Sequence, residues 1–401
     1  MNERPERASY DVVVVGGAIM GSSLAWWLTE LRYPGTVLVV ERDGTYAQAA
    51  TSHTNSCMRQ QFSHPLNVRV SRFAAEFVLN LRARMGGDER VPELSIRSFG
   101  YLYLAADEEG ADTLRANRAV QVAEGAQTRL LVPDEIAAAY PFIRTDDVVL
   151  GSINTLDEGL WDGSAVFEAW RRQARERGVE YAANEVVAMD MAPGGERVEA
   201  VRLASGERVR CGAVVDAAGP RGAGVAAMAG IALPVEPRIR FSWVFRAEAP
   251  LPRDLPLTID PSGVHVRENG GGTYLAGAGP LVDAAREPDD FAMDAELWMD
   301  RVWPALAHRV PSFERIRVLS EWAGHYDFNT LDQNAVLGPH PKVANFHFMN
   351  GFSGHGLQQS PAMGRGLAEW LTYGAYRTLD LAPFHFDRIA ANRPLPERAI
   401  I

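Results

Sequence analysis

The chain has 401 residues, of which 47% are hydrophobic and 23% charged, which predicts a folded protein with two or three domain-sized units. Its formal net charge of −11 argues against a nucleic-acid-binding surface, because phosphate backbones are bound through clustered cations. No apolar run reaches the roughly 18 residues that span a bilayer, so we expect no integral membrane segment.

The cysteine and lysine residues limit which metal, disulfide and covalent mechanisms are available to the chain. Cys57 and Cys211 form neither a disulfide framework nor a zinc pattern, so we expect no metal site and a cytoplasmic location. The polar N-terminal segment does not resemble a signal peptide. Lys342 is the one lysine among 40 basic residues, so any Schiff-base mechanism would depend on it.

The first motif is "DVVVVGGAIMGSSLAWWLTELRYPGTVLVVERD". It predicts a strand at 11–15, a glycine turn, a helix at 20–32 and a second strand at 36–40 that ends in Glu41. Gly16, Ala18 and Gly21 occupy the three positions of a dinucleotide fingerprint, with alanine in place of the middle glycine. The helix N-terminus would hold a pyrophosphate, and Glu41 would accept hydrogen bonds from ribose hydroxyls. The alternative is a tight turn without a ligand.

The middle of the chain predicts a second sheet inserted between parts of the first. We expect a polar loop at 50–59 that contacts phosphates and flavin, and helices at 67–81, 110–124 and 295–307, with another in "VPDEIAAAYPFI". Strands are expected in "RSFGYLYLAAD", over 178–219 and in an antiparallel sheet within 234–300. The strand in "VVDAAGP" would be buried and meet a ligand at its carboxyl end.

We therefore predict an α/β fold of the glutathione-reductase type. A discontinuous Rossmann-like FAD-binding domain would comprise 1–90, 145–225 and 325–401. A substrate domain of antiparallel β-sheet plus helices would comprise 91–144 and 226–324. This discontinuity favours FAD over NAD, because NAD dehydrogenases more often keep the dinucleotide half contiguous.

The last motif is "GFSGHGLQQSPAMGRGLAEWL", a glycine-rich loop that leads into a helix. Ser360 and Pro361 predict the helix start, with Ser360 as the cap. Gly351, Gly354 and Gly356 would let the backbone pass close to a flat ligand, and the helix amides would favour the flavin edge that becomes anionic on reduction. We interpret the loop as a cradle for the isoalloxazine ring. The alternative is a helix-entry loop with packing glycines.

These motifs carry a resemblance. The segments "VVVVGGAIMGSSLA", "VVDAAGP" and "GFSGHGLQQSPAMGRGLAE" resemble the D-amino-acid-oxidase superfamily of FAD proteins, which includes glycine oxidase and sarcosine oxidase. The segments "RQQFSHPLNVRVS" and "EWAGHYDFNTLDQNAVLGPHP" are similar to a mitochondrial branch of FAD-dependent oxidoreductase-domain proteins that is linked to respiratory complex I assembly. This chain lacks a transit-like N-terminus, so we interpret it as a bacterial-type relative without carrying over the assembly role.

The resemblance implies an FAD-dependent oxidase or dehydrogenase. It would oxidise the C–N bond of a primary or secondary (N-substituted) amino acid to an imine, by hydride transfer to flavin N5. The electron acceptor would be O2, a quinone or an electron-transfer protein, and the oligomeric state stays open. One alternative is an accessory or assembly protein with structural FAD. Another is an aromatic hydroxylase. It would need an NAD(P)H site, and the sequence has no second glycine fingerprint.

The sequence also departs from the family pattern. The lysine that binds the substrate carboxylate in sarcosine-oxidase-like members is matched by Gln358. Those members also use a lysine in the substrate-domain sheet to speed the reaction with oxygen, and no lysine lies around "GGGTYLAG" here. We therefore expect Arg59, or else Arg240, to hold the carboxylate, and a slow reaction with oxygen that favours a dehydrogenase. Tyr326 and Tyr274 would shape the substrate cavity.

The family also implies contacts to the flavin itself. His355 would order the flavin loop, and His53 lies where some members carry a flavin-linked histidine. A cysteinyl link is not expected, because glycine and histidine stand where such members have the cysteine. The residues that we expect to bind the cofactor are Gly16, Ala18, Ile19, Met20, Gly21, Glu41, Arg42, Ser52, His53, Asn55, Ser56, Met58, Val187, Ala218, Gly219, Gly338, Gly351, Ser353, Gly354, His355, Gly356, Leu357 and Gln358.

Overall fold

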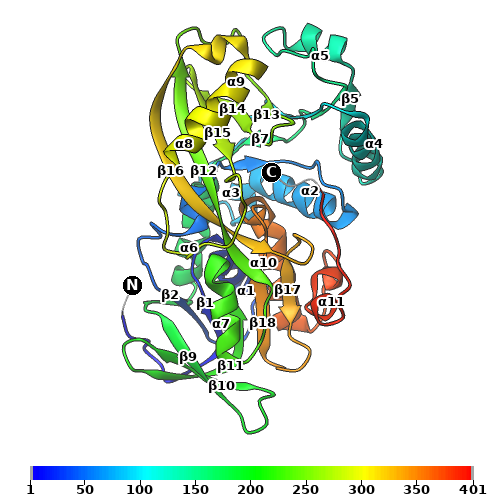
Figure 1. Ribbon diagram of the computed structural model, residues 1–401. Coiled ribbons are helices and arrows are strands. Elements are labelled where there is room, and N and C mark those ends of the chain that lie inside the picture. Colours follow the sequence, from blue (N-terminus) through cyan, green and yellow to red (C-terminus); the bar gives the residue numbers. More distant parts are fainter. Residues whose placement is uncertain (1–2, 399–401) are drawn as a thin grey trace.

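Two eight-stranded sheets dominate the computed structural model, which describes residues 3–398. Figure 1 shows one sheet in the lower half of the molecule and the other in the upper half, joined by the long strands β12 and β16. No helix in the described part of the chain is long and apolar enough to cross a membrane. The predicted α/β fold, with one mainly parallel and one mainly antiparallel sheet, is confirmed.

The lower sheet has the strand order β17-β18-β11-β1-β2-β8, and β10 and β9 extend it from β11. Strands β18, β11, β1, β2 and β8 run parallel. The bounds are β1 (Ser9–Val15), β2 (Val37–Glu41), β8 (Glu180–Ala183), β9 (Val186–Met191), β10 (Val198–Leu203), β11 (Arg208–Asp216), β17 (Val336–Pro339) and β18 (Phe346–Asn350).

The apolar run in β1 is explained by burial on both faces of this sheet. Val12 and Val14 pack into one core with the helices α1, α6 and α10, whereas Val13 and Val15 pack into a second core with α7. Because both faces are covered, no polar residue interrupts the run, as is usual for a parallel sheet.

The upper sheet has the order β16-β12-β15-β14-β13-β4-β6-β5. All neighbours are antiparallel except β13 and β4. A small third sheet pairs β3 with β7. The bounds are β3 (Cys57–Met58), β4 (Tyr101–Ala105), β5 (Arg129–Leu131), β6 (Leu150–Asn154), β7 (Gly159–Leu160), β12 (Val235–Ala247), β13 (Leu257–Ile259), β14 (His265–Gly270), β15 (Thr273–Ala278) and β16 (Ile316–Asn329).

Strand β12 has one apolar and one polar face. Phe241, Trp243 and Phe245 are buried in the core beneath α9, while Arg240 and Arg246 lie on the opposite face. This alternation is what a half-buried strand requires, and it presents Arg240 to the space between the two sheets.

The helices that the sequence predicts are present within a few residues of the expected bounds, whereas those at 81–84, 163–176, 222–228 and 387–390 were not predicted. Their bounds are α1 (Ile19–Glu30), α2 (Pro65–Leu79), α3 (Leu81–Arg84), α4 (Glu108–Ala123), α5 (Pro133–Ala139), α6 (Gly163–Glu176), α7 (Gly222–Met228), α8 (Ala295–Leu297), α9 (Trp303–Arg309), α10 (Gly356–Tyr373) and α11 (Asp387–Ala390). A π-helical turn, Trp298–Val302, joins α8 to α9.

The predicted start of the last helix is wrong. Helix α10 begins at Gly356, with His355 as the N-cap, and Pro361 lies inside it. Proline has no N–H to donate to the carbonyl of Leu357, four residues earlier. The hydroxyl of Ser360 donates to that oxygen instead, at 2.7 Å, so Ser360 acts within the helix and not as its cap.

The predicted domain boundaries stay a prediction, although one strand falls outside the expected pattern. Strand β6 lies within 145–225, a range expected in the FAD-binding domain, yet it pairs with β4 in the upper sheet. The segments expected near 180–219 and 330–350 do join the lower sheet, as β8–β11, β17 and β18.

Candidate cofactor and substrate site

A cavity of about 400 Å³ lies between the two sheets. Its lower wall is formed by the carboxyl ends of β1, β2 and β11, at Val15, Glu41 and Ala217. Its upper wall comes from β12, β14 and β16, and the start of α10 lies beside them. Ligands of doubly wound sheets bind at the carboxyl ends of the parallel strands, so this cavity is the candidate site.

Two glycines of the fingerprint permit close approach of the backbone. Gly16 has φ +101°, and a Cβ there would lie 2.4 Å from the carbonyl oxygen of Ala217. A Cβ on Gly21 would lie 1.9 Å from the carbonyl oxygen of Gly16. Gly16 therefore forms the turn against β11 and Gly21 lets α1 pack on it, the two roles expected of these positions.

The N-terminus of α1 is open toward the cavity. Its N-cap, Ala18, makes no side-chain cap, and its first turn contains no acidic residue. The amide of Ile19 makes a 3.3 Å bond to the hydroxyl of Thr51, and Ala18, Ile19 and Thr51 all line the cavity. An uncapped helix start with positive partial charge fits a pyrophosphate group.

Glu41 ends β2 at the same edge of the sheet. It is buried, and its carboxylate accepts the amides of Gly17 at 2.8 Å and Asp43 at 2.9 Å. Burial is the main cause that raises the pKa of this carboxyl above its usual range. Each carboxylate oxygen can accept a further bond, so Glu41 fits the ribose hydroxyls of a dinucleotide.

The glycines of the last motif serve packing as well as the cavity. A Cβ on Gly354 would lie 2.4 Å from the ring of Tyr326, and one on Gly351 would meet Val235, 3.2 Å away. Gly354 and Gly356 line the cavity, but Gly351 does not. The glycines that face the cavity also make room for Tyr326 and Phe352, so packing explains part of this loop. The cradle for the isoalloxazine ring stays a prediction.

Arg59 is buried and held by two residues of the α10 region. Its Nη2 lies 2.7 Å from Nε2 of His355, and its backbone amide donates to Oε1 of Gln358 at 2.8 Å. Burial, and then the charge of Arg59, hold the pKa of His355 well below its usual range, so the imidazole is neutral. Its Nε2 atom can therefore accept a hydrogen bond from the guanidinium. The guanidinium also lies 4.6 Å from the ring centroid of Phe62. Gln358 thus orients Arg59, and neither residue is among those that line the cavity.

The upper wall is basic. Arg240 and Tyr326 both line the cavity, and the guanidinium lies 4.9 Å from the tyrosine ring centroid. His265 lines it too, and is 8% exposed. Burial, with the charges of Arg267, Arg240 and Arg59, lowers the pKa of His265 to about 4. Among the described residues, the Nδ1 atom of His265 has no hydrogen-bond partner.

Tyr274 does not belong to this wall, which corrects the sequence prediction. It lies on β15 and is buried in the core beneath α9, against Phe245 and Phe313. Its hydroxyl accepts the amide of Leu251 at 2.8 Å. Because side chains alternate along a strand, the residues of β15 that pair with Phe245 and Trp243 face away from the cavity.

The other predicted cofactor residues divide into two groups. Those that line the cavity are Gly16, Ala18, Ile19, Met20, Glu41, Arg42, His53, Asn55, Ala218, Gly219, Gly354, Gly356 and Leu357. Those that lie behind or outside its lining are Gly21, Ser52, Ser56, Met58, Val187, Gly338, Gly351, Ser353, His355 and Gln358.

Two of the residues that lie outside the lining do so for a clear physical reason. Val187 is 49% exposed, and its neighbour Val186 lines the cavity instead, because a shift of one residue along β9 reverses the face. Gly338 lies on β17, where a Cβ would lie 2.7 Å from the ring of His385, so this glycine serves packing away from the site.

His53 lines the cavity but is engaged elsewhere. Its Nε2 lies 2.7 Å from the carbonyl oxygen of Ala47, and its ring stacks on Phe291 with centroids 5.3 Å apart. Covalent flavin attachment through this histidine stays a prediction. Both cysteines are free and buried.

Several lining residues were not predicted. They include Arg221, His265 and Pro288, whereas Thr51 and Thr54 belong to the loop at 50–59 that was expected to contact the cofactor. Arg221 follows the "AAGP" turn directly, so its place next to the ligand-facing end of β11 could have been inferred. His265 and Pro288 reach the cavity only through the tertiary arrangement of the upper sheet.

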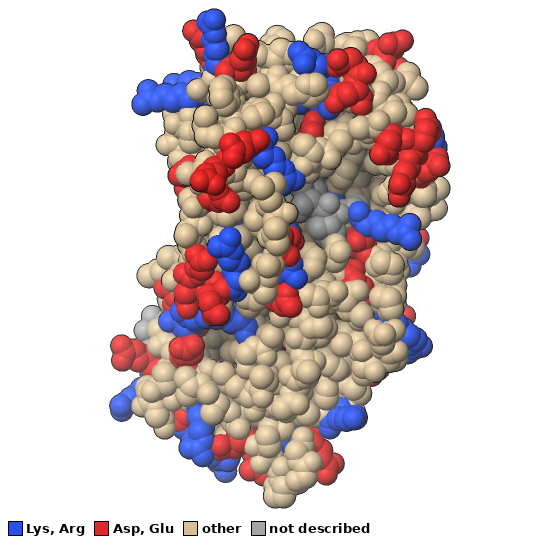
Figure 2. Space-filling model, in the orientation of Figure 1, with Lys and Arg blue, Asp and Glu red and all other residues tan. Residues whose placement is uncertain are grey.

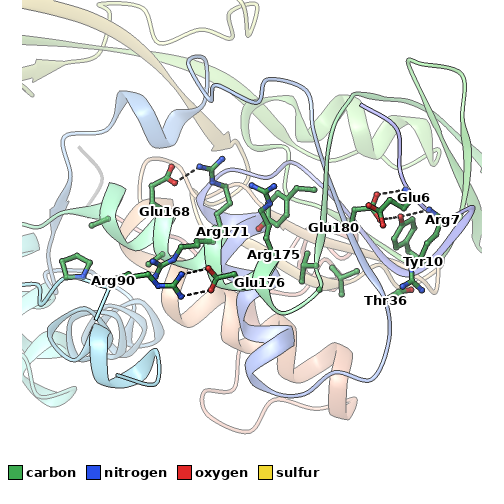
Figure 3. Close-up of a pocket in the computed structure, with 18 residues that line it drawn as sticks. Glu6, Arg7, Tyr10, Thr36, Arg90, Glu168, Arg171, Arg175, Glu176 and Glu180 are labelled. Atoms are coloured by element: carbon green, nitrogen blue, oxygen red, sulfur yellow. Dashed lines mark hydrogen bonds and ion pairs between the residues drawn. The ribbon is translucent and has the colours of Figure 1, made fainter. Parts of the chain in front are cut away.

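A second, open groove of about 930 Å³ lies at the other end of the lower sheet. Figure 3 shows its charged side chains paired with one another, including Arg90 with Glu176 and Arg171 with Glu168. It is lined by Thr36 and Val37, at the start of β2, and therefore lies away from the carboxyl ends of the strands. Figure 2 likewise shows acidic and basic side chains interspersed over one face of the molecule.

Comparisons with known proteins show the family of this chain. The family model of DAO, FAD dependent oxidoreductase, matches residues 11–370. The FAD-dependent oxidoreductase domain-containing protein 1 of Xenopus laevis is 40% identical over 99% of this chain and 85% of that protein. Human (Homo sapiens) mitochondrial sarcosine dehydrogenase is 25% identical over 99% of this chain and 44% of its own length.

The fold of this chain is also similar to those of solved structures. L-proline dehydrogenase from P. horikoshii has a TM-score of 0.82 and 25% identity, covering 98% of this chain and 100% of that one. The resemblance to the DAO family and to FAD-dependent oxidoreductase domain-containing proteins is thus confirmed, whereas these matches do not show a link to complex I assembly. FAD is the cofactor that the family uses. The chain belongs to the DAO family of FAD-dependent oxidoreductases.

Proposed function

We propose that this chain oxidises the C–N bond of a primary or secondary (N-substituted) amino acid to an imine, which water then hydrolyses. The observation that carries the proposal is the positive charge at the upper wall of the cavity, where Arg240 lies on Tyr326 and Arg59 lies behind the lining. Such a wall suits a carboxylate, which guanidinium groups bind through paired hydrogen bonds. The similarity to sarcosine and L-proline dehydrogenases supports an amino-acid substrate.

The bound flavin supplies the two-electron acceptor for the hydride of the substrate carbon. The positive charge of Arg59, which His355 and Gln358 hold in one orientation behind the cavity lining, would attract the substrate carboxylate. Tyr326, backed by Gly354, would shape the space for the carbon that reacts. Holding the reacting carbon in one place supplies much of the rate enhancement in such a reaction.

No strong base is offered by the histidines of this region. The pKa of His265 is lowered to about 4, and that of His355 lies well below its usual range. We therefore expect the substrate to react with its amine already neutral. The rate of flavin reduction should rise with pH and follow the amine pKa of each substrate.

The place of the lysine supports a dehydrogenase. Lys342 lies between β17 and β18 and does not line the cavity, so no lysine ammonium is available there to assist oxygen. We expect a quinone or an electron-transfer protein to reoxidise the flavin faster than O2 does.

The test is an anaerobic titration of the FAD-loaded protein with N-methyl and other amino acids, following the long-wavelength absorbance band of the flavin. Bleaching by a member of the panel supports the proposal, and the rate of recovery in air separates an oxidase from a dehydrogenase. If no amine or amino acid bleaches the flavin, the cofactor is structural and the chain acts as an accessory protein.

A further inference from the structure

We propose that the substrate of this site carries a second carboxylate, and that Arg240 binds it in exchange for Asp283. This inference rests on the proposed function, and it names the class of substrate: an N-substituted amino acid whose N-substituent ends in a carboxylate.

Arg240 is oriented for a carboxylate. Its Nη1 and Nη2 donate to the two oxygens of Asp283, at 2.8 and 2.9 Å, which is the forked geometry that guanidinium and carboxylate groups form. One side of the guanidinium lies on Tyr326. Its Nη1 also donates to the backbone carbonyl oxygen of Ile239, at 2.8 Å. The fork is therefore held in place by groups other than its acidic partner.

Asp283 belongs to a strap, residues 279–294, that crosses from the upper sheet to the cofactor cavity. The strap is fastened at other points: Asp289 pairs with Arg221 and lies 3.5 Å from Arg42, and Pro288 lines the cavity. The side chain of Asp283 itself is 36% exposed. Because Asp289 anchors the strap independently, the Asp283 carboxylate can turn to solvent while the strap stays in place.

Further contacts hold the strap near the flavin loop. The ring of Phe291 stacks on His53 and meets His325 edge-on, with centroid distances of 5.3 and 5.0 Å. The carbonyl oxygen of Asp290 lies 2.7 Å from Nε2 of His325.

Arg238 also holds Asp283, because its Nη1 donates to the backbone carbonyl oxygen of Asp283 and lies 3.9 Å from the carboxylate. Release of the carboxylate from Arg240 therefore breaks one pair of hydrogen bonds and leaves the backbone of the strap tied.

The surrounding charge explains why the exchange would select the substrate. The charges that act on His265, which lines the same wall, are those of Arg267, Arg240 and Arg59, and all are positive. A substrate without a second carboxylate leaves the Arg240–Asp283 pair intact and gains nothing from it. A substrate with one replaces the aspartate, restores both hydrogen bonds and adds a negative charge to a basic wall. The internal carboxylate thus acts as a competitor that only a dicarboxylate displaces.

The experiment compares sarcosine with iminodiacetate, because the two differ by one carboxylate on the N-substituent. Anaerobic stopped-flow reduction of the FAD-loaded protein gives an apparent Kd and a limiting rate for each. We expect iminodiacetate to bind more tightly to the wild type. Arg240→Gln should weaken iminodiacetate roughly 10- to 100-fold, because charged hydrogen bonds are lost. It should weaken sarcosine much less, because sarcosine loses only the general positive charge of the wall. Asp283→Asn should strengthen iminodiacetate about 2- to 10-fold, because a partly exposed ion pair no longer competes.

Two matched variants serve as controls. Arg246→Gln removes the same charge from the same face of β12 but at an exposed position away from the cavity, and it should leave the ratio of the two Kd values unchanged. Asp289→Asn loosens the strap without touching Arg240, and it should also leave that ratio unchanged. Equal weakening of both substrates by Arg240→Gln, or an equal effect of Asp283→Asn and Asp289→Asn, would overturn the inference.

Failure of the proposed function gives a different pattern. If neither compound reduces the flavin, titration calorimetry of iminodiacetate with the FAD-loaded wild type and Arg240→Gln still tests the site. Binding that is lost in the variant supports the carboxylate exchange even when turnover is absent. Absence of binding to the wild type overturns it. If sarcosine reduces the flavin and iminodiacetate binds no more tightly, the proposed function stands and this inference falls.

Discussion

The hydroxyl of Ser360 donates to the carbonyl oxygen of Leu357 at 2.7 Å, the oxygen that the amide at position 361 would reach if that residue were not proline. The side chain thus replaces a missing backbone bond inside a buried stretch of α10. This pair lets the helix begin at Gly356, where its first turn faces the cavity, rather than after the proline.

This replacement can be measured with a double-mutant cycle. Ser360→Ala should cost about 1 to 3 kcal/mol in the free energy of unfolding, because a buried carbonyl loses its partner. In a Pro361→Ala background the amide of residue 361 bonds to Leu357, so the same serine change should cost clearly less. Urea denaturation of the four proteins gives the coupling energy. A coupling near zero would show that the hydroxyl does not compensate for the proline.

The fingerprint glycines make a second prediction, about packing. Gly21→Ala places a methyl group 1.9 Å from the carbonyl oxygen of Gly16, so we expect destabilisation of more than about 2 kcal/mol. Gly224→Ala is the matched control, since Gly224 is also helical and a Cβ there meets no atom within 4 Å. Alanine at that position should leave stability unchanged or raise it by up to about 1 kcal/mol. Thermal unfolding of the flavin-free proteins compares them.

Glu41 should contribute to FAD affinity through its charge. Glu41→Gln keeps the shape of the side chain but weakens charge-assisted bonds to the ribose, so the Kd for FAD should rise about tenfold. Glu185→Gln is the control, because Glu185 also lines the cavity but is exposed to solvent. Recovery of flavin fluorescence on dissociation measures both. Equal effects of the two changes would argue against a specific role for Glu41.

Asp216 predicts a pH dependence of stability. It is fully buried at the end of β11, and burial raises its pKa to about 7 from an ordinary value near 3.8. A carboxyl whose pKa is raised in the folded state stabilises the fold at low pH and ceases to do so as pH rises through about 7. Asp216→Asn should therefore match the wild type below about pH 4 and exceed it by about 1 to 3 kcal/mol at pH 8. Chemical denaturation across this pH range measures the difference, and a pH-independent difference would contradict the buried-acid account.

The local motifs were predictable from sequence because their contacts are local. Gly16, Gly21 and Glu41 lie within one strand–helix–strand unit, where spacing alone determines which residues meet. Errors arose where one residue of register decides the face, as for Val187 on β9 and Tyr274 on β15.

The remaining features depend on tertiary contacts between distant segments. The pair of Arg240 and Asp283 joins residues 43 positions apart, and Phe291 reaches His53 across most of the chain. Neither contact has a periodic pattern or motif that would signal it. The basic wall and the strap therefore become visible only when the two sheets are placed against each other.

The long ladder between β12 and β16 has a consequence for how the molecule loses its structure. The two strands pair from Val235 with Asn329 to Ala247 with Ile316. Val235 is buried in a core of the lower sheet and Ala247 in the core of the upper sheet. Neither core can melt without breaking strands that the other one shares. The chain should therefore unfold in a single cooperative transition despite its two sheets, and loss of the cofactor cavity should coincide with loss of the whole fold.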